Sequence, residues 1–144
     1  MNQVALDFIK ARENCKLLAY LDSGGKPTVG WGATGPNIVL GTQWTQAEAD
    51  ADLNARVGKV ETSVNITTTP VRLSQQQEAA LICLAYNIGE YAFSQSHVAA
   101  FVKAGNWIAA VKAWLGFDHV NGVELRGLLK RRLEEAVLFL EGTP

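Results

Sequence analysis

The segment from Ser74 to Gly89 constrains the fold of this chain more than any other. Ser74-Gln75-Gln76-Gln77 has the pattern of a capping box, in which the serine and the third residue after it exchange hydrogen bonds at a helix start. Gly89 is typical of the position just beyond a helix C-terminus. The residues between them are apolar on nearly every side of a helix, among them Leu81, Leu84, Ala85 and Ile88. We expect this helix at the centre of the core, because such a surface must be covered by other elements.

The spacing of apolar residues elsewhere predicts further helices. Thr45-Gln46-Ala47-Glu48 is a second capping box and opens a long helix, which Thr67-Thr68-Thr69-Pro70 breaks. Shorter helices are predicted over residues 3–13, 95–104, 107–115 and 124–141. Each of the last three is followed by a glycine. The Thr-Thr-Thr-Pro run is also the one segment with the composition of a linker.

One N-terminal segment departs from the helical pattern. Residues 17–22 and 27–33 alternate as strands do, around the tight-turn sequence Ser23-Gly24-Gly25-Lys26. A loop is expected over residues 34–44. The chain is therefore predicted to be an α+β protein dominated by helix. We expect a small β-hairpin lobe, joined by the long helix to a helical C-terminal lobe, with a ligand-binding cleft between them.

The length of the chain fits this architecture. With 144 residues, 48% of them apolar and 19% charged, it suits one domain with a single sizeable core. Within the domain 1–144 we expect an N-terminal lobe of about residues 12–60 and a C-terminal lobe of about residues 65–144, the latter completed by the N-terminal helix. A monomer is expected.

Charge and residue counts exclude several classes of function. The net charge of -1 is unlike the basic excess of nucleic-acid-binding proteins, so no nucleic-acid partner is expected. Cys15 and Cys83 form no disulfide framework, and with His97 and His119 as the two histidines no metal site or other cofactor is expected. The N-terminus lacks the pattern of a signal peptide, and no apolar run reaches the roughly 18 residues of a membrane span, so no membrane insertion is expected.

Two carboxylates and a hydroxyl are spaced so that the hairpin can bring them together. Glu13 stands at the end of the first predicted helix, Asp22 follows nine residues later, and Thr28 six residues after that. Taken singly, Glu13 could be a solvated helix-end carboxylate, although its charge opposes the helix dipole there. Asp22 could be an ordinary turn residue and Thr28 an ordinary strand residue. As a set they are the groups required for general acid catalysis with a positioned water, the chemistry of glycoside hydrolysis.

The glycine-rich stretch that follows matches a nucleotide-binding motif. Gly30-Trp31-Gly32-Ala33-Thr34-Gly35 has the G-x-G-x-x-G spacing of a dinucleotide site. Such a site needs a helix that begins at the glycines, but here Pro36 and a polar loop follow. A nucleotide-binding function is therefore disfavoured.

Basic side chains gather on the last predicted helix: Arg126, Lys130, Arg131 and Arg132. Either they form a solvated face that pairs with Glu134 and Glu135, or one arginine turns inward to pair with the catalytic Glu. The aromatic side chains are expected mostly in the core, with one or two at the cleft to contact sugar rings: Trp31, Trp107, Trp114, Phe93, Phe101 and Phe117.

A series of short motifs extends along nearly the whole chain and fits one known pattern. The N-terminal part of that pattern is E-G-x-x-L-x-A-Y-x-D-x-x-G-x-x-T-x-G-x-G-H-T-G, and in register with it are Glu13, Leu17, Ala19, Tyr20, Asp22, Gly25, Thr28, Gly30, Gly32, Thr34 and Gly35. Residues 84–89, 93–96 and 127–135 match its apolar-F-N-x-G, F-x-x-S and G-L-x-x-R-R-x-x-E segments. In these residues the chain resembles the phage-type lysozymes, the muramidases that bacteriophages use as endolysins. It departs from their pattern at Asn14, which replaces a Gly, and at Ala33, which replaces a His.

The resemblance implies a role for each candidate residue. Glu13 is expected to be the general acid that protonates the leaving glycosidic oxygen. Asp22 and Thr28 are expected to hold a water on the opposite face of the sugar, with Asp22 as base or electrostatic partner. A water between the carboxylates implies inversion at the anomeric carbon. By family position, Arg131 is expected to pair with Glu13.

The resemblance also implies an activity and a setting. We expect a muramidase that cleaves the β-1,4 bond between N-acetylmuramic acid and N-acetylglucosamine in bacterial peptidoglycan, without a cofactor, for host lysis by a phage. The enzyme is expected to wait in the host cytoplasm until a holin opens the inner membrane. The alternatives are a tail-associated or chitinase-like glycosidase and a non-catalytic cell-wall binding module; Glu13, Asp22 and Thr28 count against the module.

Overall fold

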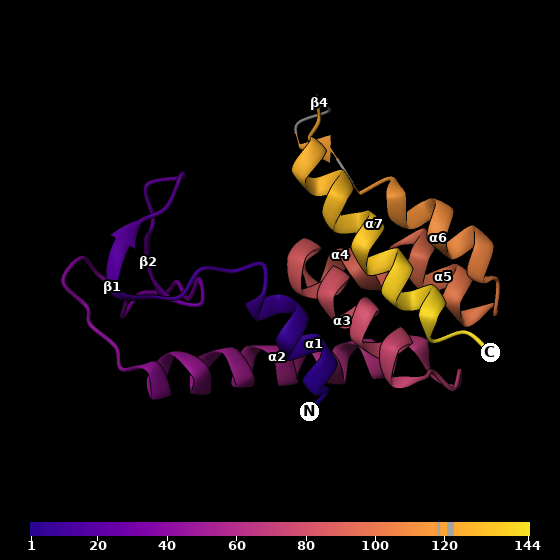
Figure 1. The fold of residues 1–144 in the computed structure, drawn as a ribbon, viewed down its shortest axis with the longest axis horizontal. Helices are drawn as coiled ribbons and strands as arrows, with labels where there is room; N and C mark the ends of the chain where they lie inside the picture. Colours follow the sequence, from indigo (N-terminus) through magenta and orange to yellow (C-terminus); the bar gives the residue numbers. More distant parts are fainter. Residues whose placement is uncertain (118, 121–122) are drawn as a thin grey trace. The chain divides into compact units, whose positions relative to one another are not determined.

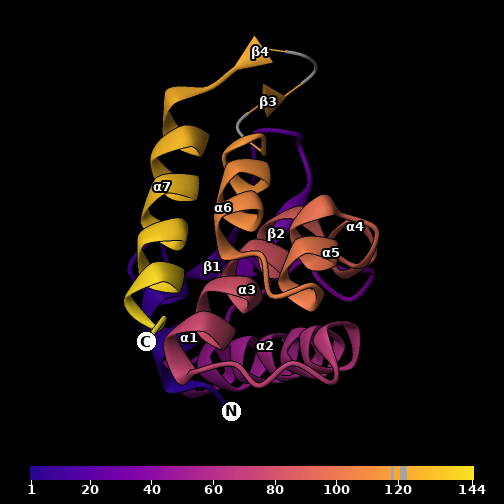
Figure 2. The same ribbon diagram turned by 90° about the vertical axis from the view of Figure 1, so that its right-hand side faces the viewer.

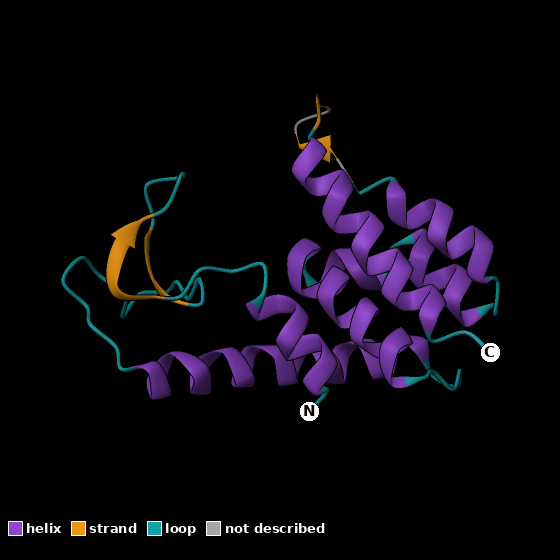
Figure 3. Ribbon diagram, in the orientation of Figure 1, coloured by secondary structure: helices purple, strands orange, loops and turns teal. Residues whose placement is uncertain are grey.

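Helices make up most of this computed structural model, which describes residues 1–117, 119–120 and 123–144 (Figures 1 and 3). The helices are α1 (Gln3–Lys10), α2 (Gln46–Thr68), α3 (Gln75–Ile88), α4 (Glu90–Ser94), α5 (His97–Lys103), α6 (Trp107–Leu115) and α7 (Arg126–Glu141). Strands β1 (Lys16–Leu21) and β2 (Pro27–Gly30) form one antiparallel pair, and β3 (His119–Val120) and β4 (Val123–Glu124) form another. The predicted α+β class, dominated by helix, is confirmed. None of the helices in the described part of the chain has the length and apolar content needed to cross a membrane.

Backbone contacts divide the chain into two compact units. The first, called the hairpin unit below, comprises Met1 and Leu6–Lys59. The second, called the helical unit, comprises Asn2–Ala5 and Val60–Pro144. Helices α1 and α2 each contribute residues to both units.

The hairpin unit is built on the β1–β2 pair. Tyr20 pairs with Thr28 and Leu21 with Pro27, and the register shifts between Lys16 and Tyr20. Such a shift bends a strand, and β1 is visibly curved in Figure 3. A small core of Ala19, Val29 and Ala33 is completed by Ile38 and Trp44. The end of the predicted loop adds to the pairing, since the Trp44 amide donates to the Leu17 carbonyl at 2.8 Å.

The helical unit is built around α3, as predicted. The Ser74 side chain accepts a hydrogen bond from the Gln77 amide and the Gln77 side chain accepts one from the Ser74 amide, so the predicted capping box is formed. Every residue from Ala79 to Ala85 is fully buried. Helix α3 packs against α7 and α4, while α6 packs against α5 and α7 (Figure 2). Trp114 and Phe93, both predicted in the core, are also fully buried.

Several predicted element ends are wrong, and each has a local cause. The first helix ends at Lys10 rather than residue 13, because the amides of Arg12 and Glu13 both donate to the Ile9 carbonyl and close the last turn. The second strand ends at Gly30 rather than residue 33, where positive φ angles of 61° at Gly30 and 83° at Gly32 turn the chain.

The predicted linker and three short elements also differ from expectation. The Thr-Thr-Thr-Pro run does not act as a linker at its start: α2 continues through Thr68, whose hydroxyl donates to the Val64 carbonyl at 2.9 Å. Helix α4 and the β3–β4 pair were not predicted, because elements of five and two residues carry no measurable periodicity. The predicted helices 95–104 and 124–141 begin two residues later, at His97 and Arg126.

Candidate active site

Glu13 lies in the short segment that joins α1 to β1. It is half-buried, and its amide donates to the Ile9 carbonyl at 3.0 Å. The neighbouring Arg12 guanidinium stacks over the Phe8 ring, 3.2 Å from the ring centroid, and donates to the Phe8 carbonyl at 2.9 Å. The backbone at Glu13 and at the residue before it is therefore ordered by contacts with the last turn of α1.

Asp22 closes the hairpin turn. Its Oδ1 atom accepts hydrogen bonds from the Gly24 amide at 2.9 Å and the Lys26 amide at 2.8 Å. Its own amide donates to the Lys26 carbonyl at 3.0 Å. Asp22 is therefore a turn residue, as one interpretation predicted, and its Oδ1 atom makes the hydrogen bonds of the turn. The same bonds also fix the orientation of the carboxylate, which a catalytic role requires as well.

Thr28 lies two residues beyond the turn on β2, and its side chain is almost fully buried. Only 4% of the residue is exposed, and its Oγ1 atom donates to the Lys26 carbonyl at 3.0 Å. Because Lys26 bonds to both residues, Asp22 and Thr28 are held at the same end of the hairpin. Since the Thr28 proton is engaged, the lone pairs of its oxygen remain the groups that can receive a hydrogen bond.

The three predicted catalytic residues belong to one compact unit. Glu13 precedes β1 and Asp22 follows it, while Thr28 pairs across the sheet with Tyr20 of the same strand. The bend in β1 draws its two ends closer than a straight strand would. Sequence order alone could not show this bend, because the register shift depends on cross-strand pairing.

Arg131 lies in the helical unit, on α7. Its Nε atom is 3.2 Å from Glu135 Oε1, and 14% of its side chain is exposed. The next residue, Arg132, is fully buried and contacts the same carboxylate, with Nε 3.0 Å from Oε2. Of the two interpretations of the basic run, the inward arginine is thus realised by Arg132, but its partner is Glu135. The pairing of Arg131 with Glu13 stays a prediction.

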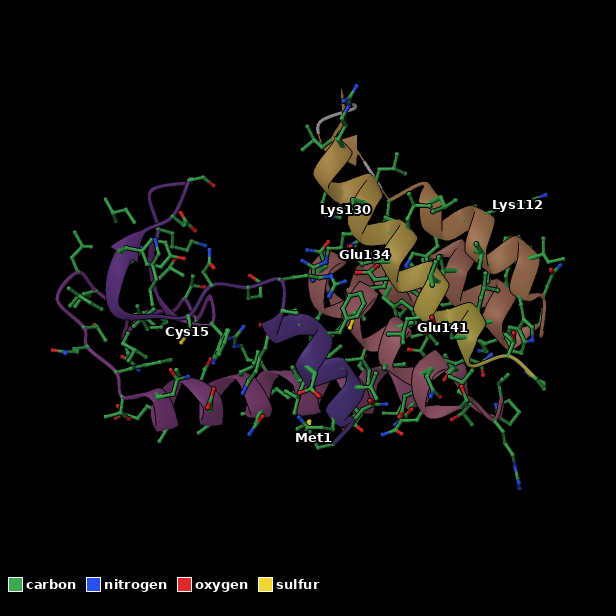
Figure 4. The ribbon with its side chains drawn as sticks, in the orientation of Figure 1. Met1, Cys15, Lys112, Lys130, Glu134 and Glu141 are labelled. Carbon is green, nitrogen blue, oxygen red and sulfur yellow. The ribbon has the colours of Figure 1, made fainter. Side chains whose placement is uncertain are left out.

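The buried carboxylate of Glu135 joins three helices of the helical unit. Trp114 of α6 donates its indole N–H to Oε2 at 3.0 Å, and Arg132 also donates to the side chain of Asn87 on α3 at 2.8 Å. Burial raises the pKa of Glu135, and the charge of Arg132, the Trp114 donor and Arg131 act against that rise. Burial has the opposite effect on the base Arg132, whose pKa it lowers, because the charged form is again disfavoured. Lys130 and Glu134 also lie on α7 (Figure 4), Lys130 exposed and Glu134 partly buried.

The glycine-rich pattern does not form a dinucleotide site. The helix that a dinucleotide motif requires does not begin at Gly30 or Gly32, because the next helix, α2, begins at Gln46. Among the residues that the structure describes, no group of three or more His, Cys, Asp and Glu side chains gathers as metal ligands do.

Comparison with known proteins decides the family. A sequence model of the family described as "Phage lysozyme" matches residues 10–135, which include Glu13, Asp22, Thr28 and Arg131. The chain belongs to the phage lysozyme family. It is therefore a phage peptidoglycan hydrolase of the glycosidase type, acting on the bacterial cell wall in host lysis.

Relatives of known sequence or structure agree with this assignment. The endolysin of Acyrthosiphon pisum secondary endosymbiont phage 1 is 34% identical over 143 residues, covering 96% of this chain and 97% of the relative. The solved endolysin of Escherichia coli O157:H7 phage FAHEc1 superposes with a TM-score of 0.88 at 32% identity, covering 98% of this chain and 93% of that one. The muramidase domain of SpmX from Asticaccaulis excentricus gives a TM-score of 0.86 at 31% identity, covering 99% and 97%.

Proposed function

We propose that the chain is an N-acetylmuramidase, which cleaves the β-1,4 bond between N-acetylmuramic acid and N-acetylglucosamine. This proposal is based on the positions of Glu13, Asp22 and Thr28 around one bent strand, β1, of the hairpin unit. A muramidase domain of known structure shares the whole fold. No cofactor is required, since the chemistry needs an acid and a held water.

Glu13 is proposed as the general acid. It lies in the segment between α1 and β1, where its carboxyl can donate a proton to the leaving glycosidic oxygen. Sugar alkoxides are poor leaving groups, so proton donation in the transition state makes a large contribution to the rate. Removing that proton while keeping the shape, as in Glu13→Gln, is expected to abolish turnover but leave substrate binding.

Asp22 and Thr28 are proposed to hold the attacking water. Oδ1 of Asp22 is committed to the turn, and the hydroxyl proton of Thr28 is committed to the Lys26 carbonyl. Both side chains therefore act as hydrogen-bond acceptors toward a water. A water that donates both hydrogens in this way keeps one lone pair directed at the anomeric carbon. The water oxygen attacks from the face opposite the leaving group, which gives inversion, and one of its protons passes to the Asp22 carboxylate as the new C–O bond forms.

Product analysis tests this proposal. Peptidoglycan digested by the enzyme is reduced with borohydride, hydrolysed and analysed for the reduced sugar at each new chain end. The proposal requires reduced N-acetylmuramic acid at the new ends, and proton NMR of the first product must show the α-anomer. Reduced N-acetylglucosamine would contradict the bond assignment, and faster cleavage of soluble chitin oligomers would favour the chitinase-like alternative. Binding without new reducing ends would favour a cell-wall binding module.

We also propose that the chain is one monomeric domain of two lobes, about residues 12–60 and 65–144 with the N-terminal helix. The division of contacts near Lys59 and Val60 supports this proposal. Scanning calorimetry should show a single transition, and sedimentation should give a mass near 15.6 kDa. Two separate transitions or a dimer mass would contradict it.

Release of the enzyme is proposed to depend on a holin, as the resemblance to endolysins implies. Expression of the chain alone in a host should leave the cells intact, and co-expression with a holin should lyse them. Lysis by the chain alone that is blocked by azide, an inhibitor of export, would contradict cytoplasmic storage.

A further inference from the structure

One carboxylate oxygen of the hairpin unit collects donors from three different segments. Oδ1 of Asp50, in the second turn of α2, accepts the Trp31 indole N–H at 2.7 Å. The same atom lies 3.1 Å from Nζ of Lys10, the last residue of α1. It also accepts the side-chain amide of Gln46 at 3.1 Å, one helical turn earlier. Three donors fix the position of a single oxygen more tightly than one contact would.

Contacts with α2 lie on both sides of the segment that contains Glu13. Lys10 precedes that segment, and Cys15, which follows it, has its sulfur 3.7 Å from Nε2 of Gln46. Gln46 and Asp50 are four residues apart on α2 and therefore share one face of the helix. The residues on either side of segment 11–14, which contains Glu13, are thus attached to the same face of α2.

Trp31 connects the same face of α2 to the strand that carries Thr28. Its side chain is held by Asp50, and its carbonyl accepts a hydrogen bond from Arg56 at 3.0 Å. Arg56 is in turn oriented by Asp52 at 2.8 Å. Trp31 follows β2 directly, so the strand end is tied to α2 through both the side chain and the backbone of one residue.

We propose that Asp50 is a positioning residue for Glu13, which fixes the acid relative to the water-holding pair Asp22 and Thr28. This inference rests on the proposed role of Glu13. Asp50 does not belong to the reacting set; it acts by joining the segment before β1 to the turn after β2. Removing it takes the shared carboxylate from Lys10 and Trp31 together, and leaves them only the contact of the Lys10 ammonium with the Trp31 ring, 5.4 Å from its centroid, so both attachments to α2 loosen at once.

The expected consequence is a loss of rate rather than of stability. About 36% of the Asp50 side chain and 33% of the Lys10 side chain are exposed. Ion pairs with that exposure contribute little to folding. A general acid, in contrast, loses rate steeply when displaced, by up to about a hundred-fold for roughly 1 Å. A change in kcat at constant KM therefore separates positioning from structural support.

The experiment compares Asp50→Ala and Asp50→Asn with the wild type on solubilised peptidoglycan, well below the midpoint of thermal unfolding. We expect kcat of Asp50→Ala to fall about 10- to 100-fold with KM changed by less than about two-fold. Asp50→Asn keeps an oxygen acceptor for Trp31, and its loss should be several-fold smaller. The matched control is Asp7→Asn, an exposed carboxylate of the same unit, which should keep kcat within about two-fold. The indole N–H resonance of Trp31 should shift upfield in Asp50→Ala.

Wild-type kcat in Asp50→Ala, or a loss seen only in KM, would overturn the inference. If Asp50→Ala does not fold, Trp31→Phe, which keeps the ring and removes the donor, carries the same test with a smaller loss of kcat. Glu13→Gln in the same assay separates the two proposals. Full activity of Glu13→Gln refutes the proposed acid, while inactive Glu13→Gln beside fully active Asp50 variants refutes only the positioning role.

Discussion

The buried carboxylate of Glu135 offers a quantitative test of what holds the helical unit together. Glu135 and Arg132 are both fully buried, and Glu135 also receives the Trp114 indole and Arg131. In Glu135→Ala, the Trp114 donor loses its partner and the buried Arg132 guanidinium loses the carboxylate that it pairs with. The variant therefore combines a lost hydrogen bond with an uncompensated buried charge.

The size of the loss follows from that geometry. Removing one partner of a buried ion pair costs about 3–5 kcal/mol, because the remaining charge stays desolvated. For a chain of 144 residues, 1 kcal/mol corresponds to about 3–4 °C in Tm. Glu135→Ala should therefore unfold about 10–20 °C below the wild type. Replacing the pair together, as in Arg132→Met with Glu135→Leu, should recover at least about half of that loss.

Urea and thermal unfolding followed by circular dichroism measure this effect. The control is Glu141→Gln, an exposed carboxylate on the last turn of the same helix (Figure 4), which should change stability by less than about 0.5 kcal/mol. If Glu135→Ala lowered the free energy of unfolding by less than about 1 kcal/mol, the buried ion pair would not stabilise the helical unit as proposed. A double variant no more stable than the single one would also contradict this prediction.

Three further predictions concern local structure. Gly30→Ala should lower the free energy of unfolding in urea by about 2–4 kcal/mol, because φ is 61° and a Cβ would meet the Trp44 side chain at 2.9 Å. Gly25→Ala, where a Cβ would enter open space, should lower it by only about 1 kcal/mol, and equal losses would contradict this prediction. Ser74→Ala should cost about 1 kcal/mol through loss of the N-cap, and an unchanged urea midpoint would contradict it. The Trp31 donor and Lys10 hold the pKa of Asp50 below its ordinary value of 3.8, so its small contribution to stability is present above pH 3.8 and is lost as the pH falls further. Asp50→Asn should slightly flatten that part of an acid titration of stability, and an unchanged slope would contradict the assignment.

Helix starts were predictable where a capping box marks them, because its determinants are local. The capping boxes at Ser74 and Thr45 each lie within four residues, and both are formed in the structure. Element ends were less predictable where the chain closes a turn, as at Lys10. Gly30 was predicted to lie inside the second strand, but its positive φ ends the strand there.

The site was predictable in part. The spacing of Glu13, Asp22 and Thr28 follows from chain order along a hairpin, and the turn chemistry of Asp22 was evident from the residues after it. The role of Asp50 was not predictable, because its partners Trp31 and Lys10 are distant in sequence and α2 is polar at that point. The inward turn of Arg132 was an open alternative, but choosing Glu135 as its partner required knowing that Trp114 faces the same point.

Release of reducing ends from purified peptidoglycan by the wild type and by Glu13→Gln tests whether Glu13 is the acid of a glycosidase. We expect steady release by the wild type and at least a roughly thousand-fold lower rate for Glu13→Gln, with unchanged Tm and unchanged binding to the cell wall. A Glu13→Gln variant that is folded and releases reducing ends at the wild-type rate would contradict the assignment of Glu13 as the acid. Absence of reducing ends from both proteins would contradict glycosidic cleavage itself.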